Sequence, residues 1–237
     1  TRTGSLWTSS AADSDSVACV MSSVRSVTMA GNSACALRTD NTLYCWGLND
    51  NYQLGLGDQI NRNTPTQVSN TATWSNVALG EAHGCGVRTN GTLWCWGANS
   101  SGQLGVGDST DRSTPTQIGA LTTWRQVSGG RDYSCAVRTT GTLWCWGANW
   151  GYELGQGNTT STTAPVQVGS GTTWRQVSAG AYSACAVRTD NTLWCWGWGP
   201  SGTLGQGDYT DRTTPIQVGT ATDWRNVTVG YFHACGT

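Results

Sequence analysis

Apolar residues recur along the chain in short alternating runs that predict β-strands with two covered faces. In Ser134–Thr139, Cys and Val alternate with Ala, and in Thr142–Trp146, Leu and Cys alternate with Trp. A strand with one face in water would alternate apolar with polar residues instead. We therefore predict a buried hairpin. Two further strands are expected to flank this hairpin. The first strand is Trp124–Ser128, and the fourth is Pro115–Ile118, which enters from the preceding loop.

The same pattern returns every 50 residues along the chain. One tryptophan of each copy opens the first strand, and a second lies in a Cys-Trp-Gly triplet. These residues are Trp74, Trp124, Trp174 and Trp224, and Trp46, Trp96, Trp146 and Trp196. Repeats of this length, with sheets that are apolar on both sides, are typical of propeller blades. The repeat predicts an all-β protein, a closed β-propeller with five blades of four antiparallel strands.

The two ends of the chain indicate how this ring closes. Gly4–Trp7 matches Gly91–Trp94, and the chain stops midway through a hairpin at His233–Thr237. We predict that the N-terminal strand completes the last blade, because an open array would leave two apolar edges uncapped. Residues 1–237 then form a single domain of five repeats. Since the chain begins with Thr rather than Met, we expect a processed form or a fragment.

Eight of the ten cysteines form pairs that are ten residues apart. The pairs are Cys35 with Cys45, Cys85 with Cys95, Cys135 with Cys145, and Cys185 with Cys195. Between them each hairpin carries a residue that tolerates positive φ, at Asn41, Gly91, Gly141 and Asn191. A three-residue loop ending there sets the two sulfurs opposite each other. We predict four disulfides, and a fifth that joins Cys19 to Cys235. Free buried thiols or a zinc site are the alternatives, although close Cys-x-x-Cys spacing is missing. Disulfides indicate a secreted or cell-surface protein.

Composition narrows the classes of function. Charged residues make up 11% of the chain, and the formal net charge is −1, with 13 arginines and no lysine. Without a basic run we expect no nucleic-acid partner, and without a stretch of eighteen apolar residues we expect no membrane span. No nucleophile elbow, phosphate-binding loop or metal motif occurs, so we expect no enzymatic activity, no cofactor and no metal. Asp58, Asp108 and Asp208 recur in the long loops and are interpreted as turn residues rather than as catalytic or calcium-binding groups.

Several short stretches of the unit carry a family resemblance. They are Gly129–Val137, Thr140–Trp144, Trp146–Asn149, Gly102–Gly105 and Pro115–Ile118. The unit resembles the repeat of the regulator of chromosome condensation family, which implies a β-propeller and a role in protein recognition. The paired cysteines and the absence of lysine are similar to its secreted bacterial members rather than to its exchange factors at chromatin. The family usually closes with seven blades, where this chain counts five. His83 and His233 stand where the family often has His, which implies structural hydrogen bonds.

The copies differ from one another mostly in the loops of one face. Antiparallel order places the loop before each first Cys strand and the long loop after each Cys-Trp-Gly strand on that same face. Exposed aromatic residues are typical anchors of recognition surfaces. The candidate binding residues are Tyr133, Trp150, Tyr152, Tyr182, Trp198, Tyr231 and Phe232. All of them belong to the last three blades, so we predict an asymmetric footprint; the alternative is that these aromatics pack over neighbouring blades.

Three functions are compatible with this pattern. The first is a secreted or cell-surface recognition module that binds a protein partner through the variable loop face. The second is a structural subunit of an extracellular assembly built from copies of itself. The third is a lectin-like, glycan-binding propeller, although the variation between copies speaks against five equal sugar sites.

Overall fold

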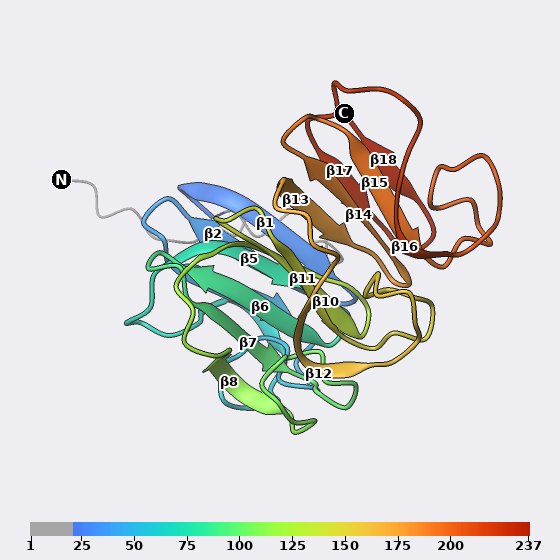
Figure 1. Ribbon diagram of the computed structural model, residues 1–237. Helices are drawn as coiled ribbons and strands as arrows, with labels where there is room; N and C mark the ends of the chain where they lie inside the picture. Colours follow the sequence, from blue (N-terminus) through green and yellow to red (C-terminus); the bar gives the residue numbers. More distant parts are fainter. Residues whose placement is uncertain (1–20) are drawn as a thin grey trace, which may run out of the picture.

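The computed structural model describes residues 21–237 as a succession of antiparallel sheets, with no helix in that part of the chain (Figure 1). Blade 1 contains β1 (Val24–Ala30), β2 (Ser33–Arg38), β3 (Leu43–Gly47) and β4 (Arg62–Gln67). Blade 2 contains β5 (Trp74–Leu79), β6 (His83–Arg88), β7 (Leu93–Gly97) and β8 (Arg112–Gln117). Blade 3 contains β9 (Trp124–Gly129), β10 (Tyr133–Arg138), β11 (Leu143–Gly147) and β12 (Thr162–Gln167). Blade 4 contains β13 (Trp174–Ala179), β14 (Ser183–Arg188), β15 (Leu193–Gly197) and β16 (Arg212–Gln217). Blade 5 is smaller, with β17 (Val227–Val229) and β18 (Ala234–Gly236).

These blades confirm the predicted propeller architecture of four-stranded antiparallel sheets. The first strands of successive blades are neighbours in chain order, from β1 to β5, β9, β13 and β17, and they surround a common axis. The N-terminal strand that was predicted to complete the last blade lies outside the described residues. Closure of the ring by that strand therefore stays a prediction. No helix that could cross a membrane occurs in residues 21–237.

The assignment of the fourth strand from the sequence was wrong. Pro115 lies in β8, which pairs with β7 of the same repeat and thus completes blade 2 rather than blade 3. Blade 3 receives its fourth strand from β12, on the far side of its own long loop. The Pro-Thr-Gln-Ile run lies between two blades in sequence, so its composition alone does not decide which sheet it joins.

The hairpins follow the predicted turn and register. In blade 1 the Arg38 backbone N–H donates to the Thr42 carbonyl oxygen, Asn41 has a φ of 67°, and Cys35 lies opposite Cys45. The other three complete blades repeat this register. The hairpin turns therefore determine which cysteines face each other.

All four predicted intra-hairpin disulfides are formed in the structure. They join Cys35 to Cys45, Cys85 to Cys95, Cys135 to Cys145, and Cys185 to Cys195. All eight cysteines are buried, with at most 2% of any of them exposed, so the bonds are part of the core. Cys19, the predicted partner of Cys235, lies outside the described residues, and Cys235 is an exposed free thiol.

The hydrophobic core lies between blades, so each blade packs on the next. In one cluster Leu93 and Leu104 of blade 2 pack against Trp124, Val127 and Trp146 of blade 3. A repeated hydrogen bond also joins blade 1 to blade 2, blade 2 to blade 3, and blade 3 to blade 4. The indole N–H of Trp96, Trp146 and Trp196 donates to the carbonyl oxygen of residue 53, 103 and 153, respectively, at 2.8–2.9 Å.

The long loops are held by a repeated polar network that confirms the turn interpretation of the aspartates. The Asp108 carboxylate accepts from the Thr110 backbone N–H at 2.9 Å and pairs with Arg112 at 2.6 Å. The buried amide of Asn99 donates to the Asp108 and Thr110 carbonyl oxygens. Arg112 holds the pKa of the Asp108 carboxyl below its usual value. These aspartates therefore close loops, which gives the loop face a defined shape.

Candidate functional site on the loop face

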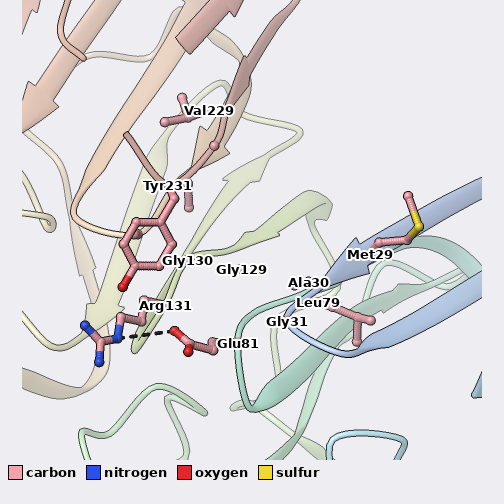
Figure 2. Close-up of a pocket in the computed structure, with 14 residues that line it drawn as sticks. Met29, Ala30, Gly31, Leu79, Glu81, Gly129, Gly130, Arg131, Val229 and Tyr231 are labelled. Carbon is pink, nitrogen blue, oxygen red and sulfur yellow. Dashed lines mark ion pairs between the residues drawn. The ribbon is translucent and has the colours of Figure 1, made fainter. Parts of the chain in front are cut away.

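One loop position that differs between the repeats lies, in every copy, at a cavity on the axis of the propeller. The cavity measures about 310 Å³ and is lined by the ends of the innermost strands. The loop between the first and second strands of every copy contributes one residue, which we call the first loop position, to this lining: Gly31, Glu81, Arg131, Ala181 and Tyr231. Figure 2 shows Arg131 and Glu81 facing each other at this lining, with the ring of Tyr231 nearby. The floor is formed largely by small residues, so the charged and aromatic groups distinguish one sector of the rim from another.

Arg131 is the centre of a charged network at this rim. Its Nε lies 3.2 Å from a Glu81 carboxylate oxygen and 3.4 Å from an Asp132 carboxylate oxygen. Its guanidinium also donates to the Tyr182 hydroxyl and lies over the Tyr182 ring, 5.3 Å from the centroid. Burial raises the pKa of the Asp132 carboxyl, and the positive charge of Arg131 opposes that shift. The network positions Tyr182 at the edge of the cavity.

Four of the predicted aromatic residues come together beside the cavity. We call Tyr182, Trp198, Tyr231 and Phe232 the aromatic cluster. The ring centroids of Tyr231 and Phe232 are 4.6 Å apart, and those of Trp198 and Phe232 are 5.8 Å apart. Tyr182 contacts the other three rings at 5.8–6.5 Å. Tyr231 and Phe232 remain 47% and 48% exposed, so the cluster presents apolar area to solvent instead of being covered by a neighbouring blade.

Two further predicted residues lie apart from this cluster. Trp150 is 66% exposed and borders a separate hollow with Ser161 and Thr163. Tyr152 is half-buried, with a positive φ of 65° in the turn that follows Trp150. The structure thus places both side chains on the predicted face but does not join them to the aromatic cluster.

The exposed position that was predicted for Tyr133 is wrong. Its side chain is only 1% exposed, and its hydroxyl donates to the Ser183 carbonyl oxygen of blade 4 at 2.7 Å. The physical reason is its place in the chain, because Tyr133 begins β10 rather than ending the preceding loop. The equivalent residues Ser33 and His83 are also buried. Tyr133 therefore links two blades and is unavailable to a partner.

His83 has the structural role that the family resemblance implied. It is fully buried, and its Nε2 lies 2.9 Å from the Ser134 hydroxyl, which itself donates to the Gln103 carbonyl oxygen. Nε2 therefore carries the hydrogen and donates it. Burial lowers the pKa of His83 to about 4. His233, by contrast, has an exposed side chain in blade 5.

Two carboxyl groups of the loop face were not among the predicted site residues. Glu81 lies at the cavity rim, and Glu153 is buried in the long loop of blade 3, where it accepts from the Gly151 backbone N–H at 2.8 Å. Burial raises the pKa of Glu153, and the nearby Asp132 charge adds to that effect. The variation at the first loop position was a usable signal for Glu81. The replacement of Gln by Glu at position 153 was a usable signal for the second.

Comparison with known protein families identifies the repeat. The model for the regulator of chromosome condensation (RCC1) repeat matches residues 40–87, 90–137, 140–187 and 190–236. The chain belongs to this family. A second RCC1 repeat model matches residues 24–53, 74–103 and 174–203. Each match to the first model begins within a hairpin turn and ends in the next blade, so the RCC1 unit of that model is offset from the structural blade. A search of curated proteins found no match.

Solved structures confirm that the fold is that of RCC1 propellers. Human WBSCR16 superposes with a TM-score of 0.83 at 23% sequence identity, over 90% of this chain and 57% of that one. Prp20p from Saccharomyces cerevisiae gives 0.80 at 18% identity, over 90% and 55%. The ectodomain of the Physcomitrella patens receptor kinase CR4 gives 0.56 at 18% identity, over 90% and 47%. The chain thus spans about half the length of these proteins, and at such identities the likeness concerns the fold alone.

Proposed function

We propose that this RCC1 repeat protein is a secreted or cell-surface recognition module, which binds a protein partner through its loop face. The observation that carries the proposal is the aromatic cluster next to the axial cavity. Tyr231 and Phe232 stay about half exposed and are held by ring contacts to Tyr182, which Arg131 fixes in turn. Such rings resemble the anchors of protein interfaces before a partner covers them. The polar loops around them would form the rim of such an interface.

Two further observations support a protein partner outside the reducing cytosol. One solved relative of the fold is yeast RCC1 (Prp20) bound to Kap60, so a propeller of this kind does engage another protein. Four intra-hairpin disulfides are typical of proteins that fold in an oxidising compartment. Family membership itself favours binding over catalysis, since RCC1 repeat proteins are mostly binding proteins or exchange factors.

Site-specific photo-crosslinking tests this proposal. A benzophenone amino acid is placed at Phe232 or at Trp198 in the aromatic cluster, and at Thr140 on an exposed hairpin turn of the opposite face as a matched control. The labelled protein is added to the secreted and cell-surface fractions of its source, and crosslinked proteins are identified by mass spectrometry. We expect one protein to be captured from Phe232 and Trp198 but not from Thr140.

Binding constants with the captured protein complete the test. Trp198→Ala and Phe232→Ala should each weaken binding about thirtyfold, because loss of an interface anchor commonly costs ~2 kcal/mol or more. Thermal melting is the control for folding, since Phe232 is half exposed and its loss should leave the melting temperature nearly unchanged. Equal capture from Thr140, or unchanged affinity in both variants, would overturn the proposal.

A further inference from the structure

Charge is unevenly divided between the two faces of the propeller. The loop face contains the loops between first and second and between third and fourth strands. Among residues 21–237 it carries nine acidic residues, seven in the long loops plus Glu81 and Asp132, against four arginines, for a net charge of −5. The turn face contains the hairpin turns and the connections between blades. In the described part of the chain it carries eight arginines against three aspartates, for a net charge of +5. The overall charge of −1 conceals this separation.

Half of the turn-face arginines recur at a single place in the repeat. Arg25, Arg125, Arg175 and Arg225 occupy the second position of their repeats, at or just before the start of the innermost strand, where blade 2 has Ser75 instead. The opposite ends of the innermost strands line the axial cavity on the loop face. These four arginines therefore lie around the other end of the same axis. We call them the arginine ring.

Within residues 21–237, three of the four arginines of the ring are held by hydrogen bonds to carbonyl oxygens, and none is paired with a carboxylate. Arg25 donates to the Ser75 carbonyl oxygen at 2.6 Å, Arg125 donates to the Arg175 carbonyl oxygen, and Arg175 donates to the Arg225 carbonyl oxygen at 2.9 Å. The first three of these guanidiniums thus reach the next arginine position, or the serine that replaces it, and Arg225 is the last in the row. Within residues 21–237 none of the four forms an ion pair, whereas all four arginines of the loop face do.

Both faces contain like charges that are held close together. On the turn face, burial and the neighbouring Arg175 charge lower the pKa of Arg125. On the loop face, Glu153 and Asp132 each have a raised pKa, mainly through burial, with further contributions from nearby carboxylates. An opposite charge that docked on either face would relieve this repulsion.

We propose that the arginine ring of one molecule docks on the loop face of a second copy, so that the protein associates head to tail along the propeller axis. The proposal rests on the proposed function, because it names a partner for the same face. Within residues 21–237 the excess charges of the two faces are equal and opposite. The arginine ring lies at one end of the axis and Glu81 at the other, and the remaining loop-face carboxylates lie mostly in the long loops that lead to the outermost strands. This complementarity favours a second copy over an unrelated acidic partner. A head-to-tail contact uses two different patches, so it does not close in a dimer and extends into stacks.

Ionic strength provides the first test on the purified full chain. Exposed charges are screened within about 10 Å at 0.1 M salt. Sedimentation velocity should therefore show species larger than the 25.1 kDa monomer at low salt, which dissociate as salt is raised. A single monomeric species at every salt and protein concentration would overturn the proposal. So would large species that high salt leaves intact.

Two charge variants test the direction of the contact. The double variant Arg125→Glu, Arg225→Glu lowers the net charge of the turn face from +5 to +1. The double variant Asp50→Arg, Glu81→Arg raises the net charge of the loop face from −5 to −1. Each variant alone should associate at least ~10-fold more weakly than the unaltered protein. Mixed one to one, they should form a discrete dimer and no longer stack, because only one productive pair of faces remains. Longer stacks, or no association in the mixture, would overturn the head-to-tail arrangement.

The single variant Arg225→Glu is the one least expected to disturb folding, because no side-chain hydrogen bond of Arg225 occurs within residues 21–237. Arg225→Lys is its control, because it preserves the charge. Arg225→Glu should weaken association and Arg225→Lys should not. Benzophenone at Phe232 in purified protein should crosslink to a turn-face peptide of another copy. If the purified protein gives no such crosslink, and the same label captures a different protein when the secreted fraction is added, the stack is overturned and the proposed function stands. If it captures neither, both fail.

Discussion

Burial of a titratable side chain has opposite consequences for stability at His83 and at Glu153. The neutral imidazole of His83 is the form that the fold accepts, so acid disfavours the folded state. The ionised carboxylate of Glu153 is the form that burial penalises, so the fold bears a cost at neutral pH that acid relieves. Each residue therefore predicts its own dependence on pH.

Acid should destabilise the protein through His83. The unfolded chain binds a proton on this residue as the pH falls below 6.5, whereas the folded protein does so only near pH 4. The free energy of unfolding should therefore fall by about 3 kcal/mol from this residue between those values. In His83→Ser, which has the residue of blades 1 and 4, that part of the loss should disappear. Urea denaturation at pH 7, 5.5 and 4 measures it, and equal losses in both proteins would contradict the assignment.

Glu153→Gln should stabilise the protein at neutral pH. Gln53 and Gln103 occupy this position in blades 1 and 2, where their Oε1 accepts from a backbone N–H at 2.8 and 2.9 Å, so the amide fits the site. Because the folded-state pKa of Glu153 is raised, the gain should be full well above that pKa and vanish near pH 4, where the carboxyl is protonated in both states. Thermal melting at pH 7 and pH 4 tests it. A variant that is no more stable at pH 7 would show that the buried carboxylate carries no cost.

Two tryptophans four residues apart should respond in opposite ways to truncation. Trp146 is fully buried and donates to the Gln103 carbonyl oxygen, so Trp146→Ala should cost about 3–5 kcal/mol of unfolding free energy. Trp150 is 66% exposed, so Trp150→Ala should change stability by about 0.5 kcal/mol or less. Chemical denaturation of both variants provides the comparison. A large loss in Trp150→Ala would mean that the side chain packs in the folded protein.

At the scale of the element, one position of the hairpin turn is sensitive to the presence of a Cβ atom. Gly141 has a φ of 75°, and a Cβ built there would lie 2.0 Å from the Thr172 carbonyl oxygen of the connection to the next blade. Asn191 holds the same turn position in blade 4 with a φ of 61°. The equivalent hairpins therefore approach their neighbours differently, although their registers agree.

Gly141→Ala should destabilise blade 3 by more than about 2 kcal/mol, because the steric overlap adds to the 1–2 kcal/mol cost of a left-handed conformation. The reverse change, Asn191→Gly, should cost about 1 kcal/mol or less, since glycine accepts the same φ. Chemical denaturation of both variants gives the two values. Comparable losses would indicate that the connection at Thr172 moves aside.

Local pattern was enough to predict the elements that are made from neighbouring residues. The turn at Asn41 and the spacing of Cys35 and Cys45 determine one register, which the structure shows. The partner of the Pro115 strand and the burial of Tyr133 depend on contacts between segments that are distant in sequence. The same holds for the aromatic cluster, whose rings come from three loops, so sequence could name its members but not their contacts.

At the scale of the whole molecule, blades 2, 3 and 4 are each held to the preceding blade by the same donor, a tryptophan indole N–H. The indole of Trp146 reaches back to blade 2, and that of Trp196 reaches back to blade 3. Coupling between blades is therefore pairwise and directional, as in other repeat proteins. The indole donors lie within the strands and their acceptors are backbone carbonyl oxygens, while the residues that differ between copies lie mostly in the loops. The loop face can thus change without loss of the frame.

The unequal charge of the two faces also makes the molecule a large permanent dipole. The loop face has a net excess of about five negative charges and the turn face of about five positive charges. Separated by the length of an innermost strand, about 20 Å, these give a dipole moment of roughly 500 debye. This is more than a hundred times that of one peptide unit, about 3.5 debye. Near a negatively charged surface the protein should rotate until its arginines face that surface. At pH 7 and low salt, a cation exchanger should therefore retain a protein whose net charge is −1, and it should release it as salt screens the dipole.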